Sequence, residues 1–342
     1  MNGLIRNLVP LALSVLGAAP ALAQDITLRV GDNLPTTHFL SEHGIQYFMD
    51  EVKTRSDGRV AFQYFPAQQV GKASDMLQLV QTGVVDIGLI LSAYVSDKMP
   101  LTGVMDLPGT YDSSCSGTRI YARLTGAGGF LDEADFADND VRNVFAFVNP
   151  PYQLFLAEKG VTSMQAVKGL KLRSPGGPLD SMIQKIGGVP IQMTSPEVYE
   201  SLSRGTIDGL VFPPPTILSY DLQGLIGSAT RAANFGNTAI AYSMNRDKWD
   251  ALPEDIRAII DEVGQETSEK VCAYADGQMD AVYGKFADNG VTSLDIAETD
   301  RAALDDTFAR VREEWAATLD RQGRAGTDAL TAFEAARRDT GS

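Results

Sequence analysis

The sequence predicts an α/β protein with two domains. Predicted strands and helices alternate between residues 25 and 91, which is typical of a parallel, doubly wound sheet. A second alternation, over residues 168–215, places strand, turn, helix, strand, helix and strand in one short stretch. About 319 residues remain after removal of a predicted leader, and a domain usually holds about 100 to 200 residues. Length and pattern therefore agree on two domains.

Residues 1–23 have the features of a secretory signal peptide. Arg6 is their only charge, an apolar run follows it, and Ala21-Leu22-Ala23 is an A-x-A cleavage signal. A membrane span needs about 20 apolar residues, and this run is shorter and is interrupted by Pro10 and Pro20. We expect cleavage after Ala23 and a protein that functions in the periplasm.

The first domain is predicted over residues 25–149 and about 238–278. It begins with an alternating strand, 25–32, whose C-terminal loop carries Asn33 and His38. Two more strands follow, with helices between them, and the second of these ends at Leu91, close to Tyr94. A strand over 239–244 is expected to return the chain to this domain.

The second domain is predicted over residues 150–237 and about 279–342. The segment 149–152, sequence NPPY, is its expected connection to the first domain and a candidate hinge. A strand ending at Arg173 runs into the turn PGGP, and a later strand ends at Phe212 before three prolines. Ligands bind at the carboxyl ends of strands in open α/β sheets. Arg173 and Phe212 are therefore expected to meet at a ligand-binding edge.

A long amphipathic pattern over residues 253–286 predicts a helix of roughly 50 Å, at about 1.5 Å of rise per residue. Its apolar positions recur at helical spacing along the whole segment. Such a helix is long enough to contact both domains.

Several motifs resemble those of substrate-binding proteins of tripartite ATP-independent periplasmic (TRAP) transporters. They are GLKLRSP at 169–175 and GGVPIQMTSPEVYESLSRGTIDG at 187–209, preceded by SDGRV, FPAQQVG, TGVVDIG and PLTGVMDLP in the family's order. The resemblance implies a two-domain, periplasmic-binding-protein-like fold with a hinge and a domain-spanning helix. It also implies a receptor that closes over a small organic acid and delivers it to the membrane permease subunits. We expect a monomer and no cofactor.

The resemblance assigns Arg173 to the ligand carboxylate, which an arginine holds with two charge-assisted hydrogen bonds. The departures from the family pattern indicate the rest of the ligand. Tyr152 or Gln153 stands where sugar-acid receptors have a second arginine, Phe212 replaces an asparagine, and Leu91 ends a strand where a polar residue is frequent. An apolar wall cannot satisfy many hydroxyl groups.

We therefore expect an apolar or aromatic monocarboxylate, or a 2-oxo acid. Its candidate contacts are Arg173, Phe212, Leu91, Tyr152, Gln153, Asn33, His38 and Tyr94. A C4-dicarboxylate ligand, or a sensor in place of a transport component, remains an alternative.

Composition and motifs exclude other classes. The formal net charge of −15 argues against nucleic acid and anionic lipid as partners. The chain has no catalytic fingerprint of a hydrolase, metalloprotease or nucleotide-binding enzyme, so no enzymatic activity is expected. His38 and His43 are the only histidines and have no cysteine nearby, which argues against a transition-metal site. The two cysteines, Cys115 and Cys272, either pair with each other or are buried separately.

Overall fold

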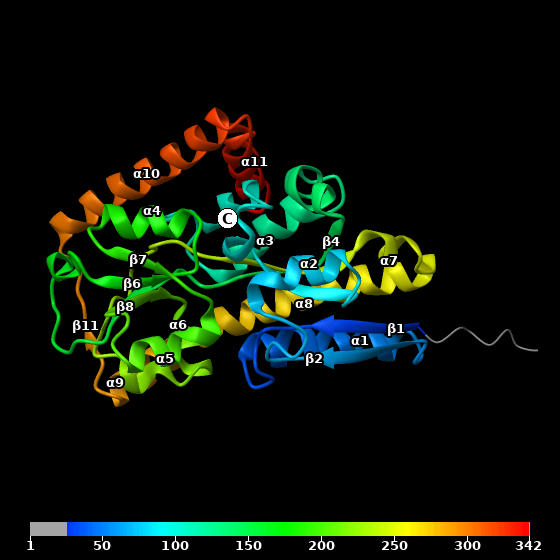
Figure 1. Cartoon of the computed structure of the whole chain (residues 1–342), viewed down its shortest axis with the longest axis horizontal. Helices are drawn as coiled ribbons and strands as arrows, with labels where there is room; N and C mark the ends of the chain where they lie inside the picture. Colours follow the sequence, from blue (N-terminus) through cyan, green and yellow to red (C-terminus); the bar gives the residue numbers. More distant parts are fainter. Residues whose placement is uncertain (1–25, 342) are drawn as a thin grey trace, which may run out of the picture.

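The computed structural model describes residues 26–341, which form two halves built on separate sheets (Figure 1). The predicted signal peptide lies outside these residues, so its cleavage stays a prediction. None of the helices within 26–341 combines the length and the apolar character that a membrane span requires.

The first sheet has the strand order β2-β1-β3-β10-β4 and the second has the order β11-β9-β5-β8-β6-β7. The strands are β1 (Ile26–Gly31), β2 (Val60–Phe65), β3 (Ile87–Leu91), β4 (Val141–Val148), β5 (Gln153–Leu156), β6 (Lys171–Ser174), β7 (Val189–Gln192), β8 (Gly209–Phe212), β9 (Ser228–Ala229), β10 (Ala239–Asn245) and β11 (Thr292–Ser293).

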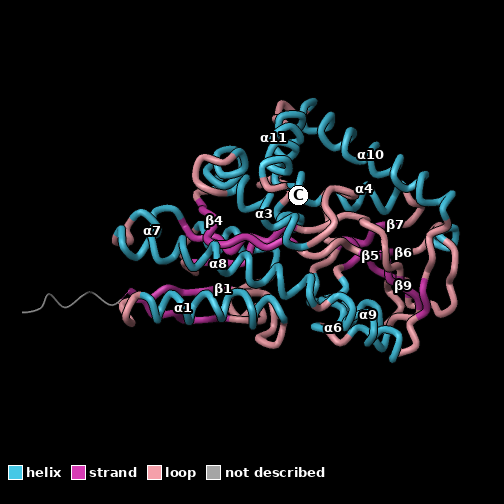
Figure 2. Tube along the Cα trace, turned by 180° about the vertical axis from the view of Figure 1, so that it is seen from behind, coloured by secondary structure: helices cyan, strands magenta, loops and turns pink. Residues whose placement is uncertain are grey.

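The helices cover the faces of these sheets and connect them (Figure 2). They are α1 (Tyr47–Arg55), α2 (Met76–Gln81), α3 (Ser114–Thr125), α4 (Pro178–Lys185), α5 (Val198–Ser203), α6 (Pro214–Ser219), α7 (Arg246–Asp250), α8 (Glu254–Gly277), α9 (Met279–Asp288), α10 (Glu298–Arg321) and α11 (Gly326–Asp339).

The first sheet confirms the predicted parallel unit and the predicted returning strand. β1 pairs in parallel with β2 and with β3. β10 comes back from the second half and pairs antiparallel with both β3 and β4. The chain therefore crosses between the halves at 149–152 and again at 230–238.

The predicted spanning helix is present with a bend. α8 packs on β4, α3 and α1 of the first half through a face that includes Ile256, Ile260 and Val263. It ends at Gly277, and after Gln278 the chain continues as α9, which packs on α6 of the second half. This is the third crossing between the halves.

Gly264 allows α8 to lie against the edge strand β4. A Cβ at this position would collide with the carbonyl oxygen of Val144. We expect Gly264→Ala to lower the unfolding free energy by about 1 to 3 kcal/mol, because the added Cβ would force the backbones of α8 and β4 apart. Gly277→Ala is the matched control on the same helix, because a Cβ there meets no atom within 4 Å. Urea unfolding should show that the control is neutral or slightly stabilising; equal stability of the two variants would contradict the close approach.

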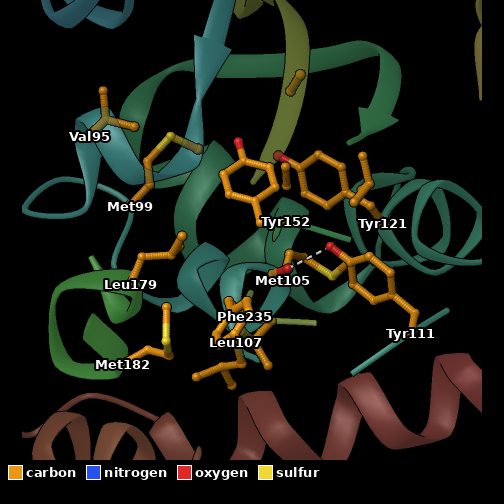
Figure 3. Close-up of a cluster of buried hydrophobic side chains, with 14 of the residues drawn as sticks. Val95, Met99, Met105, Leu107, Tyr111, Tyr121, Tyr152, Leu179, Met182 and Phe235 are labelled. Carbon is orange, nitrogen blue, oxygen red and sulfur yellow. Dashed lines mark hydrogen bonds between the residues drawn. The ribbon is translucent and has the colours of Figure 1, made fainter. Parts of the chain in front are cut away.

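The largest apolar cluster joins the halves. Figure 3 shows Tyr152, Leu179 and Met182 of the second half in the same cluster as Leu107 and Tyr111 of the first, with Tyr111 on the opposite side of the view from Leu179 and Met182. The C-terminal helices also belong to both halves, because α10 packs on α4 whereas α11 packs on α3. The strands of the two sheets are divided between the halves at the predicted residues. The domain bounds as a whole stay a prediction. α11, which we assigned to the second domain, packs on α3 of the first half.

A disulfide between Cys115 and Cys272 decides between the two alternatives that the sequence left open. It joins the first turn of α3 to α8, with the two Cα atoms 4.8 Å apart. One turn further along α8, the carboxylate of Asp276 accepts hydrogen bonds from the backbone N–H groups of Ser114 (2.8 Å) and Cys115 (3.0 Å). α8 thus both caps and crosslinks the start of α3.

Candidate functional site

Arg173 is the centre of the candidate site and is almost fully buried, with 1% of its surface exposed. Its Nε–H donates to the carbonyl oxygen of Met193 (3.2 Å), and its Nη2 donates to Tyr94 Oη (3.3 Å) and Ser195 Oγ (3.5 Å). Its Nη1 has no partner. Among residues 26–341 no carboxylate forms an ion pair with this guanidinium within 4.0 Å.

A buried cation without a counterion is costly unless an anion is supplied from outside. The unpaired Nη1 and the weakly engaged Nη2 present a fork that fits the two oxygens of a carboxylate. The arrangement can therefore hold a small anion.

Phe212 forms an aromatic wall beside this fork. β6 and β8 are parallel neighbours, and Arg173 lies opposite Leu210 in their register. The guanidinium carbon lies 4.8 Å from the centre of the Phe212 ring, which confirms that the two strand ends meet. The Tyr152 ring is 6.4 Å from the same ring, and its hydroxyl group is hydrogen-bonded to Thr238 Oγ1.

The two halves meet through a hydrogen bond at the arginine. Tyr94 lies on the turn after β3 in the first half, and its Oη accepts from the backbone N–H of Ser195 (2.8 Å) in the second half. Ser195 is held by the predicted helix start, since Thr194 N donates to Glu197 Oε2 (2.8 Å) in a capping box. Gly176, with φ near +105°, brings the turn after β6 against the carbonyl of Ala93. The halves are therefore closed over Arg173.

Three more polar groups of predicted or neighbouring residues are buried without a hydrogen-bond partner. They are His38 Nε2, Asn33 Oδ1 and Tyr220 Oη. The His38 and Tyr220 rings lie edge to face with their centres 5.8 Å apart. The positive charge on Arg173 lowers the pKa of the Tyr220 phenol, although burial raises that pKa more strongly. Tyr220 was not among the predicted site residues.

The remaining two predicted residues have different surroundings. Leu91 belongs to the apolar cluster that also contacts Tyr94 and Tyr220. The Gln153 amide instead bonds the segments where the chain crosses between the halves: its Oε1 accepts from Thr230 Oγ1 (2.9 Å) and its Nε2 donates to the carbonyls of Pro151 and Ala233. Gln153 lines a separate cavity of about 440 Å³ at the chain crossings.

No sequence signal marked Ser195 or Tyr220 as a site residue. Ser195 stands in a helix cap, where serine is common for local reasons. Tyr220 follows a helix whose neighbouring residues carry no recognisable motif. Both residues belong to the same half as Arg173, and the folding of this half brings Ser195 to the guanidinium.

Asp106 is a buried acid beside the second crossing. Its carboxylate accepts from Ser92 Oγ (2.6 Å) and from the backbone N–H of Ala239 (3.1 Å), at the start of β10. Burial raises the pKa of Asp106 to about 7. The folded protein therefore holds a proton here that an unfolded aspartate releases near pH 3.8.

This proton stabilises the fold at low pH. Its contribution is complete below pH 3.8 and is lost as the pH rises to about 7, at up to about 1.4 kcal/mol per pH unit. We expect the stability of the protein relative to Asp106→Asn to fall between about pH 5 and pH 8, measured by urea unfolding. A difference that is constant over this range would mean that Asp106 is ionised throughout.

The fold thus consists of two α/β halves, and the buried Arg173 lies where they meet. Residues 31–318 match the family model "Bacterial extracellular solute-binding protein, family 7", and the chain belongs to this family. Its members are solute receptors and not enzymes, and membership implies a location outside the cytoplasm. The resemblance to TRAP receptors is thereby confirmed.

Individual relatives are distant in sequence and close in fold. The "C4-dicarboxylate-binding periplasmic protein DctP" of Rhodobacter capsulatus is 24% identical over 94% of this chain and 96% of its own length. A TRAP solute-binding protein from an unidentified marine metagenome microbe, described as specific for aromatic acid ligands and crystallised with 3-hydroxybenzoate, has a TM-score of 0.85 at 21% identity and covers 92% of this chain and 99% of its own. The TRAP solute-binding protein of Rhodoferax ferrireducens T118, with copurified benzoate, has a TM-score of 0.82 at 24% identity, over 92% and 98%.

Proposed function

We propose that this protein is the periplasmic receptor of a TRAP transporter and that its ligand is an aromatic or apolar monocarboxylate, with 2-oxo acids included. The observation that carries the proposal is the buried guanidinium of Arg173, which has no counterion and lies 4.8 Å from the Phe212 ring. Benzoate and 3-hydroxybenzoate in two proteins of the same fold are consistent with such a site.

The single guanidinium of Arg173 can hold one carboxylate of the ligand. Around it we propose Phe212, Tyr152 and Leu91 as the apolar wall, and Tyr94, Asn33 and His38 as polar contacts. Gln153 is left out of this set, because its amide group is fully used by the hinge segment. The name of the Rhodobacter capsulatus relative makes a C4-dicarboxylate the alternative to test.

The proposed mechanism is closure on ligand binding. A ligand held by Arg173 of one half and by His38 or Tyr94 of the other binds the closed state better and shifts the population toward it. We propose that the halves move about the crossings at 149–152, 230–238 and Gln278. The closed form is then the one that the membrane subunits recognise.

A thermal-shift screen of the purified protein tests the ligand class. It includes benzoates, 2-oxo acids, aliphatic monocarboxylates, C4-dicarboxylates and sugar acids. A tight ligand at about 1,000 times its Kd should add about 4 kcal/mol to the unfolding free energy. Stabilisation by monocarboxylates supports the proposal, whereas stabilisation only by dicarboxylates or sugar acids overturns the ligand class and leaves the receptor role in place.

A further inference from the structure

The His38 imidazole has a defined proton position. Its Nδ1 accepts a hydrogen bond from the backbone N–H of Leu40 (3.1 Å), so the ring proton is on Nε2. Burial lowers the pKa of His38 to about 3, and the ring is therefore neutral at physiological pH. His38 thus presents one buried N–H donor, on Nε2, for which residues 26–341 supply no acceptor.

The partner for this donor must come from the ligand or from water, because buried donors in folded proteins are almost always satisfied. Tyr220 Oη, on the ring whose centre lies 5.8 Å from that of His38, and Asn33 Oδ1, on the loop that leads to His38, are also buried and unpaired. The phenol can donate or accept, whereas the amide oxygen only accepts. A group that both accepts and donates a hydrogen bond matches this set.

The charge around these groups is opposite in sign to that at Arg173. Asp32 is fully buried, and its carboxylate accepts from Tyr242 Oη (2.7 Å), Tyr64 Oη (3.0 Å) and the backbone N–H of Leu34 (2.8 Å). Burial raises the pKa of Tyr220 most, the negative charge of Asp32 raises it further, and Arg173 lowers it. The phenol therefore experiences charges of both signs.

We propose, on the basis of the receptor function proposed above, that the ligand carries a hydroxyl group in addition to its carboxylate, and that His38 and Tyr220 select this hydroxyl. Its oxygen accepts from His38 Nε2–H and bonds to Tyr220 Oη, whose ring centre lies 5.8 Å from that of His38. The ligand class is thus a hydroxylated aromatic or apolar monocarboxylic acid.

A second carboxylate on the ligand would not fit beside His38 and Tyr220. A neutral imidazole supplies no counterion, and the buried carboxylate of Asp32, whose charge acts on Tyr220, repels an anion. A plain apolar substituent fits no better, because it would leave the His38 donor buried and unpaired. The structure therefore discriminates against both the dicarboxylate and the unsubstituted acid.

Titration calorimetry at about pH 7.5, where His38 is neutral, with benzoate, 3- and 4-hydroxybenzoate, their methyl ethers and benzene-1,3-dicarboxylate tests this inference. We expect at least one hydroxybenzoate to bind about 10- to 100-fold more tightly than benzoate, the range that one or two satisfied hydrogen bonds provide. The dicarboxylate should bind more weakly than benzoate.

Two variants test whether His38 and Tyr220 cause the preference for hydroxybenzoate over benzoate. His38→Phe keeps a buried ring and removes the donor, and Tyr220→Phe removes a single oxygen atom and so preserves the fold. Both should lower the affinity for the hydroxybenzoate by about 10- to 100-fold and so reduce its advantage over benzoate. The matched control is His43→Phe, since the other histidine is partly exposed and stacks on Tyr274; it should retain the full preference.

The outcomes distinguish the hydroxyl inference from the proposed ligand class. Arg173-dependent binding of benzoate and hydroxybenzoate with equal affinity overturns the hydroxyl inference alone. The hydroxyl inference is likewise overturned if a folded His38→Phe or Tyr220→Phe variant keeps the full preference, or if the dicarboxylate binds most tightly. Failure of every monocarboxylate to bind, with no effect of replacing Arg173, overturns the proposed ligand class itself.

Discussion

Replacing Arg173 by methionine is expected to abolish ligand binding while leaving the fold intact. Removing one partner of a buried, hydrogen-bonded charge pair costs about 2 to 5 kcal/mol, or roughly 30- to 5,000-fold in Kd. The ligand-free protein should lose less than about 1 kcal/mol of unfolding free energy, because no internal counterion pairs with this arginine. Calorimetry with the best monocarboxylate and urea unfolding without it measure the two effects.

Arg231→Met is the matched control for this experiment. Arg231 also lies 4.8 Å from an aromatic ring, that of Tyr283, but its side chain is 61% exposed and pairs with Asp280 at 3.0 Å. Exposed ion pairs contribute about 0 to 1 kcal/mol, so this variant should bind the ligand normally. Unchanged binding by Arg173→Met would make Arg173 a structural residue and remove the basis of the proposed site.

Removal of the disulfide is expected to have the largest effect on stability. The bond closes a sequence separation of 157 residues, and cross-links of native proteins contribute about 2 to 5 kcal/mol, in part by restricting the unfolded chain. We expect the double variant Cys115→Ala/Cys272→Ala to lose an amount in this range. Denaturant unfolding of the oxidised protein and of the double variant measures it.

Reductant provides the internal control. It should destabilise the natural protein to the level of the double variant and leave the double variant unchanged. Ligand affinity should change by less than about threefold in either case, because both cysteines lie on helices of the first half and neither contacts Arg173. A reductant effect of equal size on the double variant would show that the loss does not come from this bond.

Local patterns were sufficient for much of the site. The apolar strand before Arg173, the PGGP turn after it and the prolines after Phe212 are short-range signals, and each places its residue at a strand end. Parallel neighbours then bring these ends together, which is a general property of such sheets. The helix start at Thr194 and the periodic helix after Pro253 were predictable for the same reason.

Other features depend on segments that are distant in the chain. The bend at Gln278, the packing of α11 on α3 and the pairing of Cys115 with Cys272 have no local signal. Each is decided by which surfaces meet after both sheets have formed.

The sequence by itself determined the two-sheet α/β fold and the place of Arg173 at the end of a strand, because hydrophobic period and turn residues act over a few positions. Only the tertiary structure decided which polar atoms at that edge have no partner. Arg173 Nη1, His38 Nε2 and Tyr220 Oη come from separate segments of the two halves. Whether a polar atom is satisfied depends on every group packed around it, and that environment exists only when the halves are closed.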